Sequence, residues 1–200
     1  TVSRFLPNIM TWRALRDLGV EDAELEANLR ATLTESLDIL IREQNPDGGW
    51  GWFGHMESNP YVTAYAALGL IEARAAGFDF RQDPIDRALN FVRSDFVRPG
   101  IDTPSWQLNR QAFYPYVLAR GGANVAAERD ALFAQRLEMD YWARAFLLMA
   151  YLEQDPTSPR AADLVSDLQT GAILSATGAH WEETGRDWRN WASDTRTTAI

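Results

Sequence analysis

Three short segments of this chain repeat one pattern, and this repetition constrains the fold more than any other feature. In segments 58–64, 139–145 and 193–199, an Asn or Asp is followed five positions later by an Ala. A turn rich in Gly and Trp precedes the first and the third segment, at 47–52 and 178–181. Internal self-similarity of this kind indicates an array of similar supersecondary units. We therefore expect stacked helical hairpins.

Hydrophobic periodicity predicts two alternating kinds of helix. Some segments are apolar on nearly every side, whereas the segments between them are apolar on one face only. We expect the apolar helices at 60–75, 106–118 and 141–152 and the amphipathic ones at 22–41, 83–96, 125–137 and 161–174, with a first helix over 2–15 and a last one beginning at 194. This order predicts an all-α fold, an α/α toroid of buried inner helices ringed by outer helices.

The toroid is expected to form one domain over residues 1–200 and to be incomplete at the C-terminal end. A ring of six hairpins needs about twelve helices, and the periodicity indicates about nine. Missing hairpins would expose an apolar edge, so the sequence also predicts self-association of this chain.

Composition excludes several classes of function. The net charge is −9 without a clustered basic face, so nucleic acid is not an expected partner. No apolar run approaches the ~20 residues of a membrane span. The chain has no Cys, which excludes disulfides, thiolate zinc sites and a cysteine nucleophile within these residues. All nineteen basic residues are Arg, which removes lysine-based catalysis as well. No cofactor is implied.

Gln44-Asn45-Pro46-Asp47-Gly48-Gly49-Trp50 resembles the Gln-x-x-Asp-Gly-x-Trp element of triterpene cyclases, which share the toroid. The resemblance implies that Gln and Trp fasten an outer helix to the next turn, and we interpret the element as structural. Terpenoid cyclisation would need an Asp-rich motif, and 79–83 does not supply one. Protein prenyltransferases need a zinc-binding Cys, which this chain lacks.

Asp140 and Asp194 are the candidate carboxylates for an alternative, an α/α-toroid enzyme acting on carbohydrate or terpenoid substrates. Glycoside hydrolysis uses two carboxylates roughly 5–10 Å apart, and both residues begin expected inner helices. Because Asp at a helix start is commonly an N-cap, capping is the favoured interpretation for both. Glu57, Glu182 and Glu183 are weaker candidates because they lie in expected loops.

His55 and His180 are the two histidines, and both lie near the Gly/Trp turns. Two His side chains and a carboxylate could in principle bind a catalytic zinc ion. Their spacing gives no support for this, so we expect ordinary hydrogen bonds and no metal site.

Four groups of residues resemble, in order, the thioester-containing domain of bacterial alpha-2-macroglobulins. The first, Thr1-Val2-Ser3-Arg4-Phe5-Leu6-Pro7-Asn8, is similar to the segment directly after the Cys-x-Glu-Gln thioester motif. The others are 44–52 with 59–65, 108–113 with 116–119, and 188–199. Together they cover essentially the whole chain.

The resemblance implies a complement-like domain of a protease-trapping protein, an endopeptidase inhibitor rather than an enzyme. In this family a Cys and a Gln form an internal thioester, and cleavage by a protease exposes it to nucleophiles. The implied partners are proteases and the other macroglobulin domains, in the periplasm or outside the cell, with an anchor in the parent protein. The implied site residues are the thioester-flanking Thr1, Val2 and Phe5, and the lining residues Trp52, His55, Trp106 and Asn109.

The chain departs from the family pattern in two ways. The reactive quartet is absent, so these residues alone carry out no thioester chemistry. Complement-type members also use a downstream His, and the region 101–111 has Trp106, Gln107 and Asn109 but no His. We therefore expect direct reaction with amines rather than transfer to hydroxyls.

Overall fold

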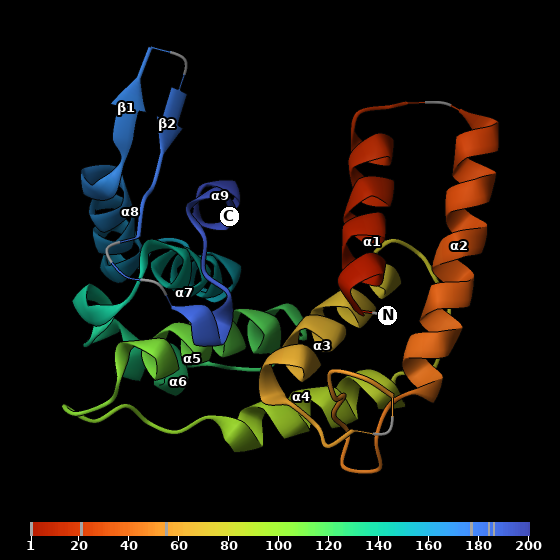
Figure 1. Ribbon diagram of the computed structural model, residues 1–200, viewed down its shortest axis with the longest axis horizontal. Coiled ribbons are helices and arrows are strands. Elements are labelled where there is room, and N and C mark those ends of the chain that lie inside the picture. The colour runs from red at the N-terminus through yellow and green to blue at the C-terminus, as the bar shows by residue number, and fades with distance from the viewer. Residues whose placement is uncertain (1, 21, 55, 177, 184, 186) are drawn as a thin grey trace. The chain divides into compact units, whose positions relative to one another are not determined.

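The computed structural model describes residues 2–20, 22–54, 56–176, 178–183, 185 and 187–200, with side chains described from Phe5 onward. The chain divides into two compact units, Thr1–Asp95 and Phe96–Ile200, and each is described by itself. Helices dominate both units (Figure 1), which confirms the prediction of an all-α fold. The incomplete α/α toroid stays a prediction. Among the described residues, no helix is both long and apolar enough to cross a membrane.

The first unit is built around one buried helix. Its helices are α1 (Val2–Asp17), α2 (Ala23–Arg42), α3 (Pro60–Ala75) and α4 (Asp83–Asp95). Twelve of the sixteen residues of α3 are buried, and α3 packs against both α1 and α4. The apolar segment 60–75 is therefore an inner helix with the predicted bounds.

Local capping sets the starts of two of these helices. Asp22 accepts a hydrogen bond from the backbone N of Leu25 at 2.9 Å, and Asn59 accepts from the backbone N of Tyr61 and Val62. Asp and Asn are common N-cap residues, because their short side chains reach the free amides of the first turn. The apolar face of α2 is buried in the second half of the helix, at Leu33, Leu37 and Leu40, whereas Leu25 near its start is 44% exposed.

Trp50 and Gln44 fasten the outer helix α2 to the helices that follow it. The indole Nε1 of Trp50 donates to the carbonyl of Leu40 at 2.8 Å, and the backbone N of Trp50 donates to Thr63 Oγ1 at 2.9 Å. Gln44 Nε2 donates to the carbonyl of Pro84 at 2.9 Å. The structural interpretation of this element is confirmed.

The second unit repeats the Trp50 arrangement at Trp181. The indole Nε1 of Trp181 donates to the carbonyl of Leu168 at 2.7 Å, and its backbone N donates to Thr198 Oγ1 at 3.1 Å. In both units one Trp joins the end of an outer helix to a Thr in the next inner helix. We call these two sets of bonds the tryptophan staples, and they give the sequence repetition its structural meaning.

The second unit is built around two packed helices. Its elements are α5 (Ser105–Arg120), α6 (Ala126–Phe133), η1 (Arg136–Glu138), α7 (Tyr141–Gln154), α8 (Pro159–Gly171), β1 (Ile173–Ser175), β2 (Gly178–His180), η2 (Trp188–Asn190) and α9 (Asp194–Ala199). The largely buried helices α5 and α7 form its core, where the ring centroids of Phe113 and Phe146 lie 4.6 Å apart. Pro115 lies inside α5 without ending it.

The end of α8 differs from the sequence prediction. The expected helix over 161–174 ends at Gly171, and β1 then pairs antiparallel with β2 in a short hairpin (Figure 1). Gly171 lies so close to Tyr141 that an added Cβ would be 2.2 Å from the Tyr141 ring. This approach of α7 is a tertiary contact, so periodicity within 161–174 could not indicate it.

Candidate functional site

The residues predicted to flank the thioester are only partly described. Thr1 and His55 lie outside the described residues, and for Val2 only the helical backbone is described. Phe5 is buried in the core of the first unit, against Gly69 of α3. Its role in the described structure is helix packing.

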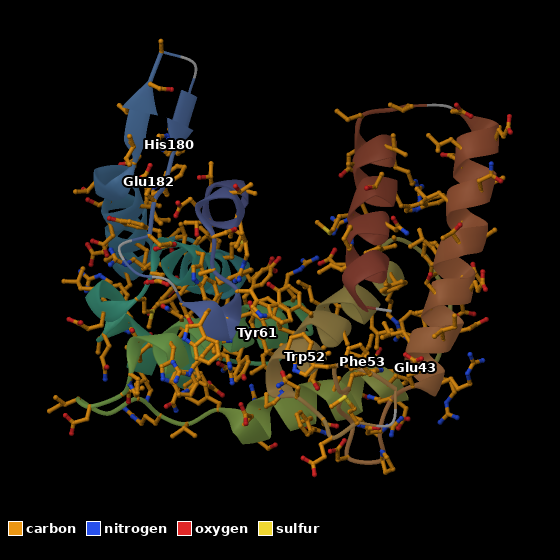
Figure 2. The ribbon with its side chains drawn as sticks, viewed as in Figure 1. Glu43, Trp52, Phe53, Tyr61, His180 and Glu182 are labelled. Carbon is orange, nitrogen blue, oxygen red and sulfur yellow. The ribbon has the colours of Figure 1, made fainter. Side chains whose placement is uncertain are left out.

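Trp52 lies on an exposed loop of the first unit. Trp52 and its neighbours Phe53 and Met56 are all exposed, and Figure 2 labels the first two. The loop is tied down by Asn45, whose Nδ2 donates to the carbonyl of Met56 at 2.9 Å. Phe53 was not among the predicted lining residues, although it is the most exposed of the three.

The remaining predicted lining residues, Trp106 and Asn109, lie on α5 in the second unit. Asn109 is buried and both ends of its amide are occupied. Its Oδ1 accepts from the backbone N of Asp140 at 2.8 Å, and its Nδ2 donates to Asp187 Oδ2 at 3.0 Å. Asn109 therefore joins α5, the start of α7 and the loop before η2.

Glu183 caps α7 from a distant loop. Its carboxylate accepts from the backbone N of Tyr141 at 3.0 Å and of Trp142 at 3.2 Å, and from Thr197 Oγ1 at 2.8 Å. A negative charge at a helix N-terminus is stabilised by the free amides and the helix dipole. The loop carboxylate thus provides the cap that the sequence assigned to Asp140.

The predicted capping roles of Asp140 and Asp194 are wrong. Asp140 occupies the N-cap position of α7, but its side chain makes no capping hydrogen bond, because Glu183 already holds the free amides. Asp194 is the first residue of α9, whose cap is Ser193. The Oδ1 atom of Asp194 instead accepts from the backbone N of Glu183 at 3.0 Å, which positions the capping loop.

Asp140, Glu183 and Asp187 form what we call the carboxylate cluster. Burial, and then the negative charges of Glu183 and Asp187, raise the pKa of Asp140 from 3.8 to about 6. Trp142 and Asn109 act in the opposite direction but do not outweigh these effects. The Oδ2 atom of Asp140 is buried and has no hydrogen-bond partner among the described residues. The charge of Asp140 therefore changes near pH 6.

The segment after Glu183 is held by Asn190, which is fully buried. Asn190 Nδ2 donates to the carbonyl of Trp106 at 2.7 Å and to Asp187 Oδ2 at 2.6 Å. Its Oδ1 accepts from Arg110 Nε at 3.1 Å. These bonds fix η2 against the start of α5.

Sequence reasoning missed three residues of this network, namely Glu183 as a cap, Asp187 and Asn190. All three lie in the irregular segment before α9, where hydrophobic periodicity carries no information. The Asp187-to-Asn190 spacing is typical of a short capped turn, since the backbone N of Asn190 donates to Asp187 Oδ1. This spacing is the sequence signal that could have indicated the turn.

His180 is the one candidate histidine that lies within the described residues. His180 Nε2 lies 3.4 Å from Glu182 Oε1 on the exposed hairpin side of the unit, where Figure 2 labels both residues. In the part of the chain that is described, no three His, Cys, Asp or Glu side chains are arranged to hold a metal ion.

Comparison with known proteins adds sequence evidence. No family model matches the chain. It is 28% identical over 193 residues to an alpha-2-macroglobulin of Thermotoga maritima, which covers 92% of the chain. It is 32% identical over 145 residues to an alpha-2-macroglobulin homolog of Yersinia pestis, covering 70% of the chain.

The chain is homologous to bacterial alpha-2-macroglobulins.

Solved alpha-2-macroglobulin structures agree with this in fold. The Salmonella protein reacted with methylamine matches 98% of the chain with a TM-score of 0.72 and 19% identity. The Escherichia coli protein from domain MG7 to the C-terminus matches 98% of it with a TM-score of 0.72 and 18% identity. The chain spans only 11% and 7% of the two sequence relatives, and 13% and 31% of these two structures.

Proposed function

We propose that this chain is part of the thioester domain of a protease-trapping alpha-2-macroglobulin. The observation that supports this most is the sequence relation over 92% of the chain, together with the ordered motifs that begin at residue 1. The Escherichia coli alpha-2-macroglobulin has been solved in a trypsin-activated form and in a form activated by porcine elastase. For our chain, proteases and the other macroglobulin domains of its parent are the proposed partners.

The proposed chemistry takes place at a thioester made by a Cys-x-Glu-Gln motif upstream of Thr1. An acyl electrophile of this kind persists only where water is excluded until a conformational change exposes it. The described residues would serve as the scaffold, through buried helices such as α3, α5 and α7. We infer that the domain acts as an inhibitor module and has no catalytic turnover of its own.

Asn109 supports reaction with amines rather than with hydroxyls. Acyl transfer to a hydroxyl is assisted by an imidazole that acts as nucleophile or base. The region 101–111 has no His, and the Asn109 amide bonds to Asp140 through its oxygen and to Asp187 through its nitrogen. The proposed thioester would therefore react directly with primary amines such as lysine side chains.

The test uses the full-length parent protein. Its sequence upstream of Thr1 is read, and its free thiols are counted before and after exposure to methylamine and, separately, to glycerol. The proposal expects Cys-x-Glu-Gln, one additional thiol with methylamine and none with glycerol. Trypsin should then form a conjugate that survives boiling in detergent. Retention of trypsin without a new thiol would leave trapping but overturn covalent attachment, and failure to retain trypsin would overturn the proposed function.

The enzyme alternative keeps one observation in its favour. Asp140 combines burial, neighbouring carboxylates and a raised pKa, which is the environment of a general acid. Its expected partner Asp194 is engaged by the backbone N of Glu183, and Glu183 itself holds three donors. A hydrolase activity that Asp140→Asn abolishes would support the alternative, whereas activity unchanged in that variant would exclude this residue pair.

The location of the parent protein is proposed from the family alone, as periplasmic or extracellular with a membrane anchor outside these residues. Fractionation of the source cells with an antibody against this domain tests it. Recovery in the cytoplasmic fraction would contradict the proposal.

A further inference from the structure

A ladder of arginine and tryptophan side chains lies at the surface of the second unit. The guanidinium Cζ of Arg189 lies 4.5 Å from the ring centroid of Trp188 and 5.4 Å from that of Trp106. The Cζ of Arg110 lies 5.3 Å from the Trp106 centroid. We call these four residues, together with Trp191, the Arg–Trp ladder. Trp106 is also an implied lining residue of the thioester site, whereas Arg189, Trp188 and Trp191 have no role in the thioester chemistry or in the carboxylate cluster.

Arg189 is exposed and oriented, but its hydrogen-bonding capacity is unused. Within the described residues, its guanidinium has ring contacts and no hydrogen-bond or salt-bridge partner. Contact with two indole rings restricts the position of the group while leaving its N–H groups available. A planar guanidinium held in this way is suited to bind a carboxylate through two parallel hydrogen bonds.

The exposed tryptophans of the ladder place apolar surface beside Arg189. Trp188 is 69% exposed and Trp191 is 61% exposed, although both are large aromatic residues. Trp191 adopts a left-handed backbone conformation with φ of 51°, which costs free energy in a bulky residue and persists only where surrounding contacts fix it. The buried Asn190 lies between the two tryptophans and is held by its bonds to Trp106, Asp187 and Arg110.

The charges of the chain select the kind of partner. With a net charge of −9 and with Asp187 of the carboxylate cluster at the start of η2, a polyanion such as nucleic acid would be repelled overall. One oriented guanidinium beside exposed indoles matches a single carboxylate next to apolar groups. Trp and Arg are the residues most enriched among the strongest contributors to protein interfaces.

We propose that the Arg–Trp ladder is a docking surface for a peptide segment that carries a Glu or Asp carboxylate beside apolar side chains. The carboxylate pairs with Arg189, and the apolar neighbours cover Trp188 and Trp191. This inference is independent of the proposed function, because it rests only on contacts within the second unit.

The experiment titrates the full 200-residue chain with a blocked peptide, acetyl-Gly-Leu-Glu-Leu-Gly-amide, and follows the indole N–H signals by NMR. The signals of Trp188 and Trp191 are assigned with single Trp→Phe variants. Parallel titrations use the same peptide with Gln in place of Glu, and inorganic phosphate alone. We expect the Glu peptide to shift both signals with a Kd of about 1 mM or below, and the Gln peptide to bind at least about tenfold more weakly.

Two variants test the role of Arg189. Arg189→Gln should weaken binding of the Glu peptide by about tenfold or more, and Arg189→Lys should recover only part of it because Lys lacks the planar group. Arg98→Gln is the matched control, because Arg98 is also exposed in this unit and contacts no aromatic ring in the described structure. This variant should bind the Glu peptide as tightly as the wild type does. The proposal would be overturned if the Glu and Gln peptides bound equally well, or if Arg189→Gln bound the Glu peptide as tightly as the wild type does. It would also be overturned if the indole signals did not shift up to about 10 mM peptide, or if phosphate bound as tightly as the Glu peptide.

Discussion

At the scale of single residues, Glu183 should contribute more to stability than its neighbour in sequence. Glu183→Ala leaves the amides of Tyr141 and Trp142 and the hydroxyl of Thr197 without their acceptor. We expect a loss of about 2 kcal/mol in the free energy of unfolding, the upper end for an N-cap. Urea denaturation followed by circular dichroism measures it.

Glu182→Ala provides the control for that measurement. Glu182 is exposed and contacts only His180 among the described residues, so its removal should change the free energy of unfolding by less than about 0.5 kcal/mol. Equal losses in the two variants would show that Glu183 does not act as a cap.

Asp140 should make the chain less stable as the pH rises from about 4 to about 6. Its pKa is raised from 3.8 to about 6 in the folded state, so the folded state binds more protons than the unfolded state in this window. Above about pH 6 the Asp140 carboxylate is ionised close to Glu183 and Asp187, so the full loss of folding stability is present. Because the group is partly exposed, we expect a cost of roughly 1–2 kcal/mol.

Asp140→Asn removes this charge and tests that prediction. Urea denaturation between pH 4 and pH 8 should show the variant more stable than the wild type at pH 8 and similar to it near pH 4. A wild-type advantage at pH 8, or an unchanged pH dependence in the variant, would contradict the assignment.

These residues show why capping was predictable at some helices and not at others. Asp22 and Asn59 bond to amides two or three positions away, so the sequence around them contains the whole interaction. Glu183 caps a helix that begins 42 residues earlier in the chain. A contact of that kind depends on how the segment before α9 packs, which local spacing does not encode.

At the scale of elements, the two tryptophan staples should differ in strength. Trp50 is buried, so Trp50→Phe leaves the Leu40 carbonyl without its donor and opens a gap in the core. We expect a loss of about 2–3 kcal/mol, since both an unpaired buried acceptor and lost packing contribute. Trp181 is only half-buried, so Trp181→Phe should cost about 1 kcal/mol. Thermal and urea denaturation of both variants measures the difference, and a larger loss at Trp181 would contradict this ranking.

The prediction of elements succeeded where two independent signals coincided. For α3, an apolar run begins at a capping Asn and a Pro in the first turn, and the predicted bounds are those observed. For α8, apolar spacing continues past Gly171, but the helix ends at that glycine, where Tyr141 packs against it. Leu174 therefore lies in β1, where it is 80% exposed, rather than on a helix face.

At the scale of the whole molecule, charge and exposed apolar surface act in opposite directions. The net charge of −9 and the pI of about 4.7 favour separate molecules at neutral pH and low salt. Exposed apolar side chains in α7, α8, β1 and at the chain end favour contact, namely Leu152, Val165, Ile173, Leu174 and Ile200. The balance between these effects depends on ionic strength, because salt screens the repulsion and not the apolar attraction.

We therefore predict that the 200-residue chain associates with itself as the charge repulsion is removed. Sedimentation velocity at about 100 μM protein should show mainly monomer at pH 8 and about 20 mM salt, and a growing dimer or larger species at about 0.5 M salt or near pH 5. Leu174→Glu, at the most exposed of these apolar positions, should reduce the association, whereas Leu137→Glu serves as the control because Leu137 is exposed outside this group. A strictly monomeric chain under all of these conditions would show that the exposed apolar residues are too dispersed to form an interface.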